Sequence, residues 1–210
     1  MKYILKRTNR KTIAISIVDG KVIVRAPLWL DQQHIDAFVE TKSTWIQKKL
    51  LAYRPMGIDV ASDFVRLYGE KIPIIRNQGR KFNVQLNGAL FVTLPNMNDI
   101  ETLNKKVEDT LKPEFINYLT PLVEKYARLL KIKTPPFMVR RYKRIHGRCN
   151  SKGDLSFNLY LMQESKEFIE YVVLHECAHI LEFNHSKAFY QIIETHMPNY
   201  KAIIKANKVQ

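Results

Sequence analysis

Five consecutive residues, His175-Glu176-Cys177-Ala178-His179, have the residue types and spacing of a metal-binding helix, and His185 follows them. Two histidines four residues apart on an α-helix lie on the same face, with Cβ atoms roughly 5–6 Å apart, so both imidazoles can reach one metal ion. Glu176 lies about 100° round the helix from His175, which is close enough to act on a water molecule that the metal activates, without being a ligand itself. The pattern therefore predicts metal-dependent hydrolysis with Glu176 as the general base.

His185 is the candidate third ligand. If the helix continued unbroken past His179, His185 would point in a different direction, so a three-histidine site requires the helix to end between them. Asn184 is expected to provide that end in the left-handed C-cap conformation, and Ser186 to cap a following helix. Proteases with the pattern H-E-x-x-H-x-x-G-x-x-H make this turn with a glycine, whereas the position is Glu182 here. Three ligands beside a carboxylate favour a catalytic site with an open position over a structural site with four protein ligands.

Length and composition predict a globular protein. With 210 residues, 46% of them hydrophobic, the chain can fill one ordinary core and a smaller module. No run of 18 apolar residues occurs, and residues 1–18 alternate charged and apolar residues where a signal peptide needs an unbroken apolar core. We therefore expect a cytoplasmic protein without membrane association. Cys149 and Cys177 are expected to be reduced, because two cysteines do not make a disulfide framework.

The first part of the chain is predicted to be rich in strands. Residues 3–5, 12–18 and 21–25 have strand patterns, with a hairpin turn at Asp19-Gly20 between the last two. From residue 31 to about 53 the hydrophobic period becomes helical, which predicts one helix or a pair of helices. A second β segment follows at 64–94 and contains two hairpins, the later one with a tight turn at Asn87-Gly88.

The second part is predicted to be mainly helical. Helical spacing runs from about residue 100 to 131, and the prolines leave open whether residues 113–131 form one kinked helix or two. Strand character returns at 137–144 and 154–161, with a turn-like segment at 147–153. The helix that carries the histidines is expected to begin after Ser165 as its N-cap, and one or two closing helices follow His185.

These elements predict an α+β fold. A β-rich N-terminal part, residues 1–95 with a helix at about 31–53, is expected to pack on a C-terminal domain, residues 96–210, that carries the H-E-x-x-H helix. A strand followed by a buried metal helix is the order that zinc peptidases of the zincin type use, and such a strand can pair with an extended peptide. The expected partner is therefore a peptide or protein substrate.

The chain resembles the YgjP-like metallopeptidase family, bacterial proteins related to the SprT-like and WLM-type zincins. The resemblance extends over nearly the full length and rests on Arg25-Ala26-Pro27, Trp45-Ile46, Tyr68-Gly69-Glu70-Lys71, the segment 152–158, and above all the histidine motif with His185. It implies that His175, His179 and His185 bind Zn²⁺ and that Glu176 activates water. One departure is His146-Gly147-Arg148-Cys149-Asn150, where the family usually has Trp-Gly-Ser-Cys-Ser.

The expected reaction is zinc-dependent hydrolysis of a peptide bond, in which Glu176 takes a proton from water and passes it to the leaving amine. Tyr160, Asn158 or an arginine of the 140–148 stretch would stabilise the transition state, and the sequence does not choose among them. Glu182 is either an acceptor for a ligand imidazole or an exposed carboxylate at a helix end. Three further histidines lack metal spacing to the motif, namely His34, His146 and His196.

A formal net charge of +14 favours an anionic partner. Cationic residues form two clusters, Arg140, Arg141, Lys143, Arg144, Arg148 and Lys152 before the motif, and Lys6, Arg7, Arg10 and Lys11 near the N-terminus. Arginines for phosphate and the nearby Tyr142 and Phe157 for stacking would suit nucleic acid, whereas charges on a strand edge also guard it against aggregation. The alternative function is therefore a nucleic-acid-associated binding protein with a structural or vestigial zinc site. A third hypothesis keeps the metal hydrolysis and changes the bond cleaved, and the oligomeric state stays open.

Overall fold

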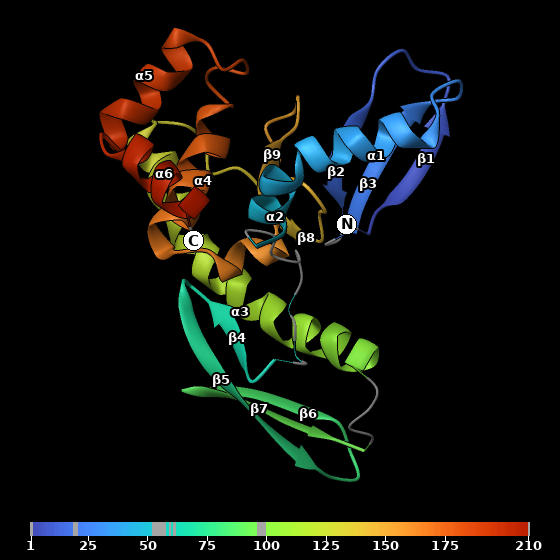
Figure 1. The fold of residues 1–210 in the computed structure, drawn as a ribbon. Coiled ribbons are helices and arrows are strands. Elements are labelled where there is room, and N and C mark those ends of the chain that lie inside the picture. The colour runs from blue at the N-terminus through green and yellow to red at the C-terminus, as the bar shows by residue number, and fades with distance from the viewer. Residues whose placement is uncertain are drawn as a thin grey trace. The chain divides into compact units, whose positions relative to one another are not determined.

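The computed structural model describes residues 2–18, 21–51, 58, 60, 62–95 and 100–209. Over these residues the fold is mixed α+β, with three small sheets and six α-helices (Figure 1). The chain forms two compact units, residues 1–55 and 56–210. Each unit has its own hydrophobic core. No helix in the described part of the chain is long and apolar enough to cross a membrane.

The first unit consists of a three-stranded sheet and two helices. Its elements are β1 (Ile4–Thr8), β2 (Ala14–Val18), β3 (Lys21–Pro27), α1 (Gln32–Thr41) and α2 (Ser43–Leu51). The central strand β3 pairs in parallel with β1 and antiparallel with β2. The predicted helical segment is a pair of helices that separate at Lys42, which is the C-cap of α1. The expected turn at Asp19-Gly20 and helix end near residue 53 lie outside the described residues.

The second unit begins with a four-stranded sheet of order β4-β5-β7-β6. Its strands are β4 (Phe64–Leu67), β5 (Glu70–Gln78), β6 (Asn83–Asn87) and β7 (Ala89–Leu94). The two hairpins are antiparallel as predicted, and a parallel pairing of β5 with β7 joins them into one sheet. Gly88 has φ +67° in the second hairpin turn, a conformation in which a Cβ atom is strained.

The remaining elements form the C-terminal part of the second unit. They are α3 (Ile100–Leu129), β8 (Phe137–Arg140), β9 (Gly147–Cys149), β10 (Leu155–Asn158), the 3₁₀-helix η1 (Leu159–Gln163), α4 (Lys166–Ala178), α5 (Lys187–His196) and α6 (Tyr200–Val209). The sheet order is β8-β10-β9, with β10 parallel to β8 and antiparallel to β9. The prediction of a turn-like segment at 147–153 is wrong for its first three residues, which form the edge strand β9.

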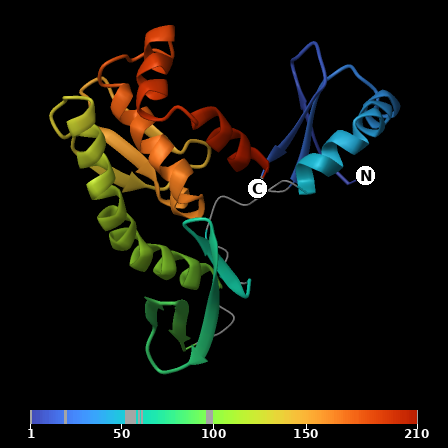
Figure 2. The ribbon, with the colours of Figure 1, turned by 90° about the vertical axis from the view of Figure 1, so that its left-hand side faces the viewer.

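α3 is a single helix of 30 residues that contains both Pro113 and Pro121. It extends from the four-stranded sheet to the part that contains β8 and α4 (Figure 2). A buried stripe at helical spacing continues past both prolines, comprising Leu103, Val107, Leu111, Phe115, Leu119, Val123 and Tyr126. Burial along the whole stripe compensates for the backbone hydrogen bonds that prolines remove inside a helix.

The two units divide earlier along the chain than the boundary at 95/96 that the sequence favours. Leu90 and Val92 of the β4–β7 sheet are fully buried and belong to the same core as the apolar residues of α3 and α4. The four-stranded sheet therefore groups with the C-terminal helices, because its apolar face is covered by α3.

Candidate metal and catalytic site

α4 positions His175 and Glu176 in its last turn. The side chain of Ser165 caps the helix as predicted, accepting a hydrogen bond from the Phe168 N–H at 3.2 Å. From Phe168 to Ala178 every residue is buried except Glu170 and His175, which are half-buried. Packing on nearly all sides fixes the rotation of the helix, and so the directions in which its polar residues point.

The helix ends between His179 and His185, as a three-histidine arrangement requires. His179 is the C-cap residue of α4, with φ −63° and ψ −18°. The expected cause is wrong, because Asn184 is not among the described non-glycine residues with positive φ, which are Tyr68 and Lys131. Ser186 caps α5 as predicted and accepts a hydrogen bond from the Phe189 N–H at 3.2 Å.

The three motif histidines converge on one point. The Nε2 atom of His175 lies 3.2 Å from Nε2 of His179 and 3.0 Å from Nε2 of His185. One ligand atom from each ring lies within 4.8 Å of the others. Two nitrogens that bind a tetrahedral zinc ion at 2.0–2.1 Å are about 3.3–3.4 Å apart. The two separations from His175 are within a few tenths of an ångström of that spacing, and the three rings together could hold a metal ion.

The second nitrogens of two of these rings have hydrogen-bond partners, and the partner of His179 fixes the tautomer that can bind a metal. Nδ1 of His179 lies 3.3 Å from the backbone carbonyl oxygen of Glu182, which can only accept, so this nitrogen carries the proton and Nε2 keeps its lone pair. Nδ1 of His175 lies 3.3 Å from the Tyr171 hydroxyl. Glu182 thus contacts a motif imidazole through its carbonyl.

The electrostatic environment keeps the imidazoles of His175 and His179 neutral. Burial, followed by the neighbouring His179 and His185, lowers the pKa of His175 to about 3. Burial also lowers the pKa of His179, while its hydrogen bond to the backbone of Glu182 raises it by a smaller amount. Neutral imidazole is the form that binds a metal, so these two rings do not have to lose protons to bind one at neutral pH.

Glu176 is buried beside the histidines, with 6% of its surface exposed. Burial raises the pKa of its carboxyl to about 7, against a hydrogen bond from the backbone of Cys149 that lowers it. Cys149, which donates this hydrogen bond, belongs to the strand β9. A Cβ atom at Gly147 would lie 2.7 Å from Oε1 of Glu176, so only glycine lets the strand approach this carboxylate without displacing it.

His175, His179, His185 and Glu176 line one pocket of about 270 Å³, together with Phe183 and the β9 residues 147–149. Among the described residues, no other histidine, cysteine or carboxylate joins the three histidines as a potential ligand. The arrangement combines three nitrogen donors, one poised carboxylate and space for a small group, which is what metal-assisted hydrolysis requires.

The three predicted candidates for transition-state stabilisation lie in different places. Asn158 is fully buried, and its side chain donates to the carbonyls of Tyr142 and Ile145 and accepts from the Tyr142 N–H, so it anchors the 142–145 loop. The Tyr160 hydroxyl bonds to Glu108 and Arg141. Of the candidates, Arg148 is the one that lines the pocket.

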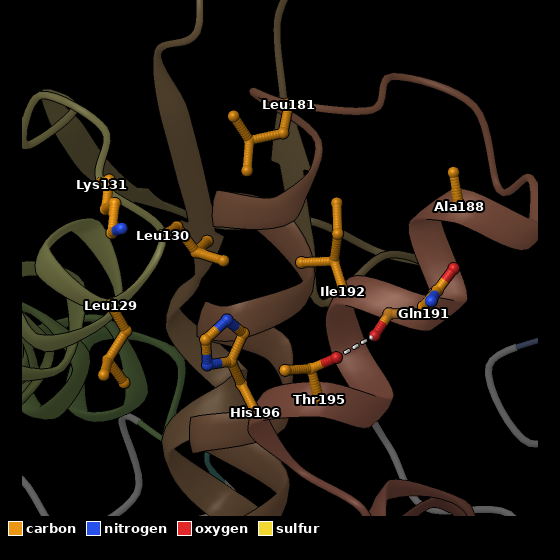
Figure 3. Close-up of a pocket in the computed structure, with 9 residues that line it drawn as sticks. All are labelled: Leu129, Leu130, Lys131, Leu181, Ala188, Gln191, Ile192, Thr195 and His196. Carbon is orange, nitrogen blue, oxygen red and sulfur yellow. Dashed lines mark hydrogen bonds between the residues drawn. The ribbon is translucent and has the colours of Figure 1, made fainter.

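A larger pocket of about 430 Å³ lies between the end of α3 and α5 (Figure 3). Its lining is mainly apolar and includes Leu130, Leu181 and Ile192, with His196 and Lys131 as its titratable groups. His196 is not part of the cluster of potential metal ligands.

The cationic cluster before the motif differs from the sequence expectation in two respects. Phe157 is fully buried and cannot stack on a base. Arg141 pairs with Glu108 at 2.5 Å and with Asp109 at 2.8 Å. The remaining cations of the cluster are exposed.

Replacing Gly147 with alanine is expected to destabilise the protein by about 1–3 kcal/mol, because the new methyl group overlaps Glu176 in a packed environment. Urea unfolding measures the loss. In a Glu176→Ala background the overlapping atoms are absent, so the same substitution should cost much less. Equal costs in the two backgrounds would contradict the contact.

The buried carboxyl predicts a pH-dependent stability difference between the parent and Glu176→Gln. The pKa of Glu176 rises from 4.5 to about 7 on folding, so its contribution to stability is lost as pH rises through this interval. Glutamine does not titrate, and the variant should gain up to about 3 kcal/mol over the parent between pH 4 and pH 8. Urea unfolding of both proteins checks this, with a metal chelator present so that bound metal does not contribute to the stability of either protein. A difference that stays constant with pH would contradict the prediction.

Comparison with models of protein families gives a match to the YgjP-like, metallopeptidase domain over residues 11–206. Comparisons with curated proteins and with solved structures give no match.

Proposed function

Because the chain belongs to the YgjP-like metallopeptidase domain family, we propose that it is a zinc-dependent peptidase in which His175, His179 and His185 bind the ion and Glu176 is the general base. The C-terminal part would then be a zincin-like domain built round α4. The observation that carries the proposal is the convergence of three imidazoles and one buried carboxylate on a single pocket.

Three features of the site support a catalytic role over a structural one. A structural zinc site is closed by four protein ligands, whereas the described residues supply three. The pocket of about 270 Å³ leaves room for a reacting group. Glu176 is held by a backbone hydrogen bond and by close packing of β9, so its carboxylate has a fixed direction.

The ion would supply Lewis acidity, polarising the scissile carbonyl and making water more acidic. Glu176 accepts the proton of the attacking water at its carboxylate and donates it to the nitrogen of the leaving amine. A pKa near 7 suits a group that must accept and release a proton at neutral pH. The guanidinium of Arg148 is the candidate for stabilising the negative charge that develops on the carbonyl oxygen.

The edge strand β9 supports a peptide as substrate. It pairs on one side with β10, and its residues 147–149 line the pocket. An extended peptide can add to the edge of a sheet through main-chain hydrogen bonds, which would place a peptide bond beside the histidines.

The proposal is tested by incubating the zinc-loaded protein with a proteome-derived peptide library and identifying new termini by mass spectrometry. Cleavage should require Glu176, cease with a chelator and return with added zinc. Cleavage at the same sites by Glu176→Gln would show that a contaminant is responsible. If the zinc-loaded protein cleaves nothing in the library, the peptide-bond part of the proposal is wrong.

A further inference from the structure

The turn after β3 in the first unit exposes two large apolar side chains. Leu28 is 63% exposed and Trp29 is 75% exposed. They lie between the last residue of β3 and Asp31, the N-cap of α1. The two adjacent side chains form a contiguous exposed apolar patch, which is the kind of surface feature that marks interaction sites.

The backbone of this turn is held in place by Arg7. Its guanidinium donates hydrogen bonds to the carbonyl oxygens of Pro27 at 3.4 Å, of Leu28 at 3.3 Å, and of Leu30. These bonds hold the backbone on both sides of Trp29. Trp29 is therefore presented to solvent on an ordered support.

Cationic residues lie at the same end of the sheet. β1 and β3 are parallel, with Thr8 opposite Pro27, so the segment after β1 leaves the sheet beside the turn that holds Trp29. This segment contains Arg10 and Lys11. Nε of Arg10 is buried and has no hydrogen-bond partner among the described residues. No acceptor among the described residues therefore holds Arg10 through this nitrogen.

The first unit is also strongly cationic as a whole. Residues 1–55 contain eleven lysines and arginines against four aspartates and glutamates. The acid closest in sequence to the turn, Asp31, accepts a hydrogen bond from the His34 N–H at 2.9 Å and lies 2.7 Å from its ring nitrogen. The excess of cations in this unit favours an anionic partner.

We propose that this surface, formed by Leu28, Trp29, Arg10 and Lys11, binds single-stranded nucleic acid independently of the metal site. Trp29 stacks on a base with Leu28 against its edge, and Arg10 and Lys11 contact the phosphates. An aromatic side chain that stacks on bases beside cations that follow the backbone is the means by which proteins bind single strands without sequence preference.

An anionic membrane is the other partner with matching chemistry, and the apolar area argues against it. A single myristoyl chain gives only marginal membrane binding, with an association constant on the order of 10⁴ M⁻¹. One leucine and one tryptophan bury less apolar surface than such a chain. Stacking needs only the face of one indole, which Trp29 supplies.

The test measures fluorescence anisotropy of a labelled oligothymidylate with the full-length protein over a series of salt concentrations. Binding should weaken steeply with salt, and Trp29→Ala should weaken it by about 10-fold or more, as expected for loss of one stacked base. Arg10→Gln combined with Lys11→Gln should reduce the salt dependence. Trp45→Ala, which removes a 43% exposed tryptophan of α2, is the matched control and should bind as the parent does.

Several outcomes would overturn the proposal. These are no binding at low salt, equal losses in the two tryptophan variants, or duplex binding as tight as single-strand binding and indifferent to Trp29. Trp29-dependent binding to phosphatidylserine vesicles without binding to the oligonucleotide would assign the surface to a membrane. Circular dichroism of each variant shows whether it is folded.

Discussion

Glu176→Gln is expected to keep its metal and to lower kcat by about 10²–10⁴-fold, the range that a general base contributes. Glutamine has nearly the same shape as glutamate and can still accept the hydrogen bond from the backbone of Cys149, so the packing of β9 on residue 176 is preserved. It cannot take a proton from water. The change therefore separates proton transfer from metal binding, and the measurement is metal content by mass spectrometry beside peptide cleavage rate.

Glu167→Gln is the matched control for this prediction. It makes the same chemical change on the same helix, in the first turn of α4, where the side chain is exposed. Its activity should equal that of the parent. If Glu176→Gln lost its zinc, the carboxylate would have to be a ligand and its assignment as base would be wrong.

His185→Ala is expected to lower zinc affinity by more than about 100-fold, because replacing even a group that only orients a ligand costs 10–100-fold. The residue lies outside α4, and its Nε2 atom is 3.0 Å from that of His175. Without His185, only His175 and His179 remain, and they do not supply the three protein ligands of a catalytic zinc site. Competition with a chromophoric chelator measures the affinity, and cleavage activity should disappear in parallel.

His196→Ala provides the comparison for the ligand variant. It removes the same side chain from the end of α5, where it lies outside the metal cluster. Its zinc affinity should be unchanged. A His185→Ala protein that binds zinc as tightly as the parent would mean that two histidines and a different group hold the ion.

The histidine cluster could be predicted from the sequence because its information is local. A spacing of four on a helix places His175 and His179 on one face, and Ser165 and Ser186 are caps that act on the residues next to them. The requirement for a helix end before His185 follows from helix geometry alone. The means of ending it could not be predicted, because Asn184 is only one of several residues that tolerate the C-cap.

β9 and the role of Gly147 could not be predicted, because they depend on long-range contacts. Three residues that include a glycine have weak strand propensity, and β9 exists because it pairs with β10 and packs on α4. The glycine has meaning only beside the Glu176 carboxylate, which is distant in sequence. The role of Asn158 also depends on distant residues. The alternation along its strand does not reveal that its side-chain amide donates hydrogen bonds to the 142–145 loop, so the sequence leaves it as a candidate for transition-state stabilisation.

The parallel pairing of β5 with β7 and the grouping of their sheet with α3 are likewise tertiary features. Hairpins are encoded by the turns between their strands, and Gly88 is such a signal. The join between two hairpins has no turn to mark it. It depends on which faces are buried against α3, and a single sequence does not specify that.

The central claim is that three imidazoles share one ion, and X-ray absorption at the zinc edge of the stoichiometrically loaded protein tests it most directly. We predict one zinc per chain with three imidazole nitrogens at about 2.0–2.1 Å and no sulfur in the coordination sphere. Fewer than three imidazoles, or a sulfur at about 2.3 Å from Cys149 or Cys177, would contradict it.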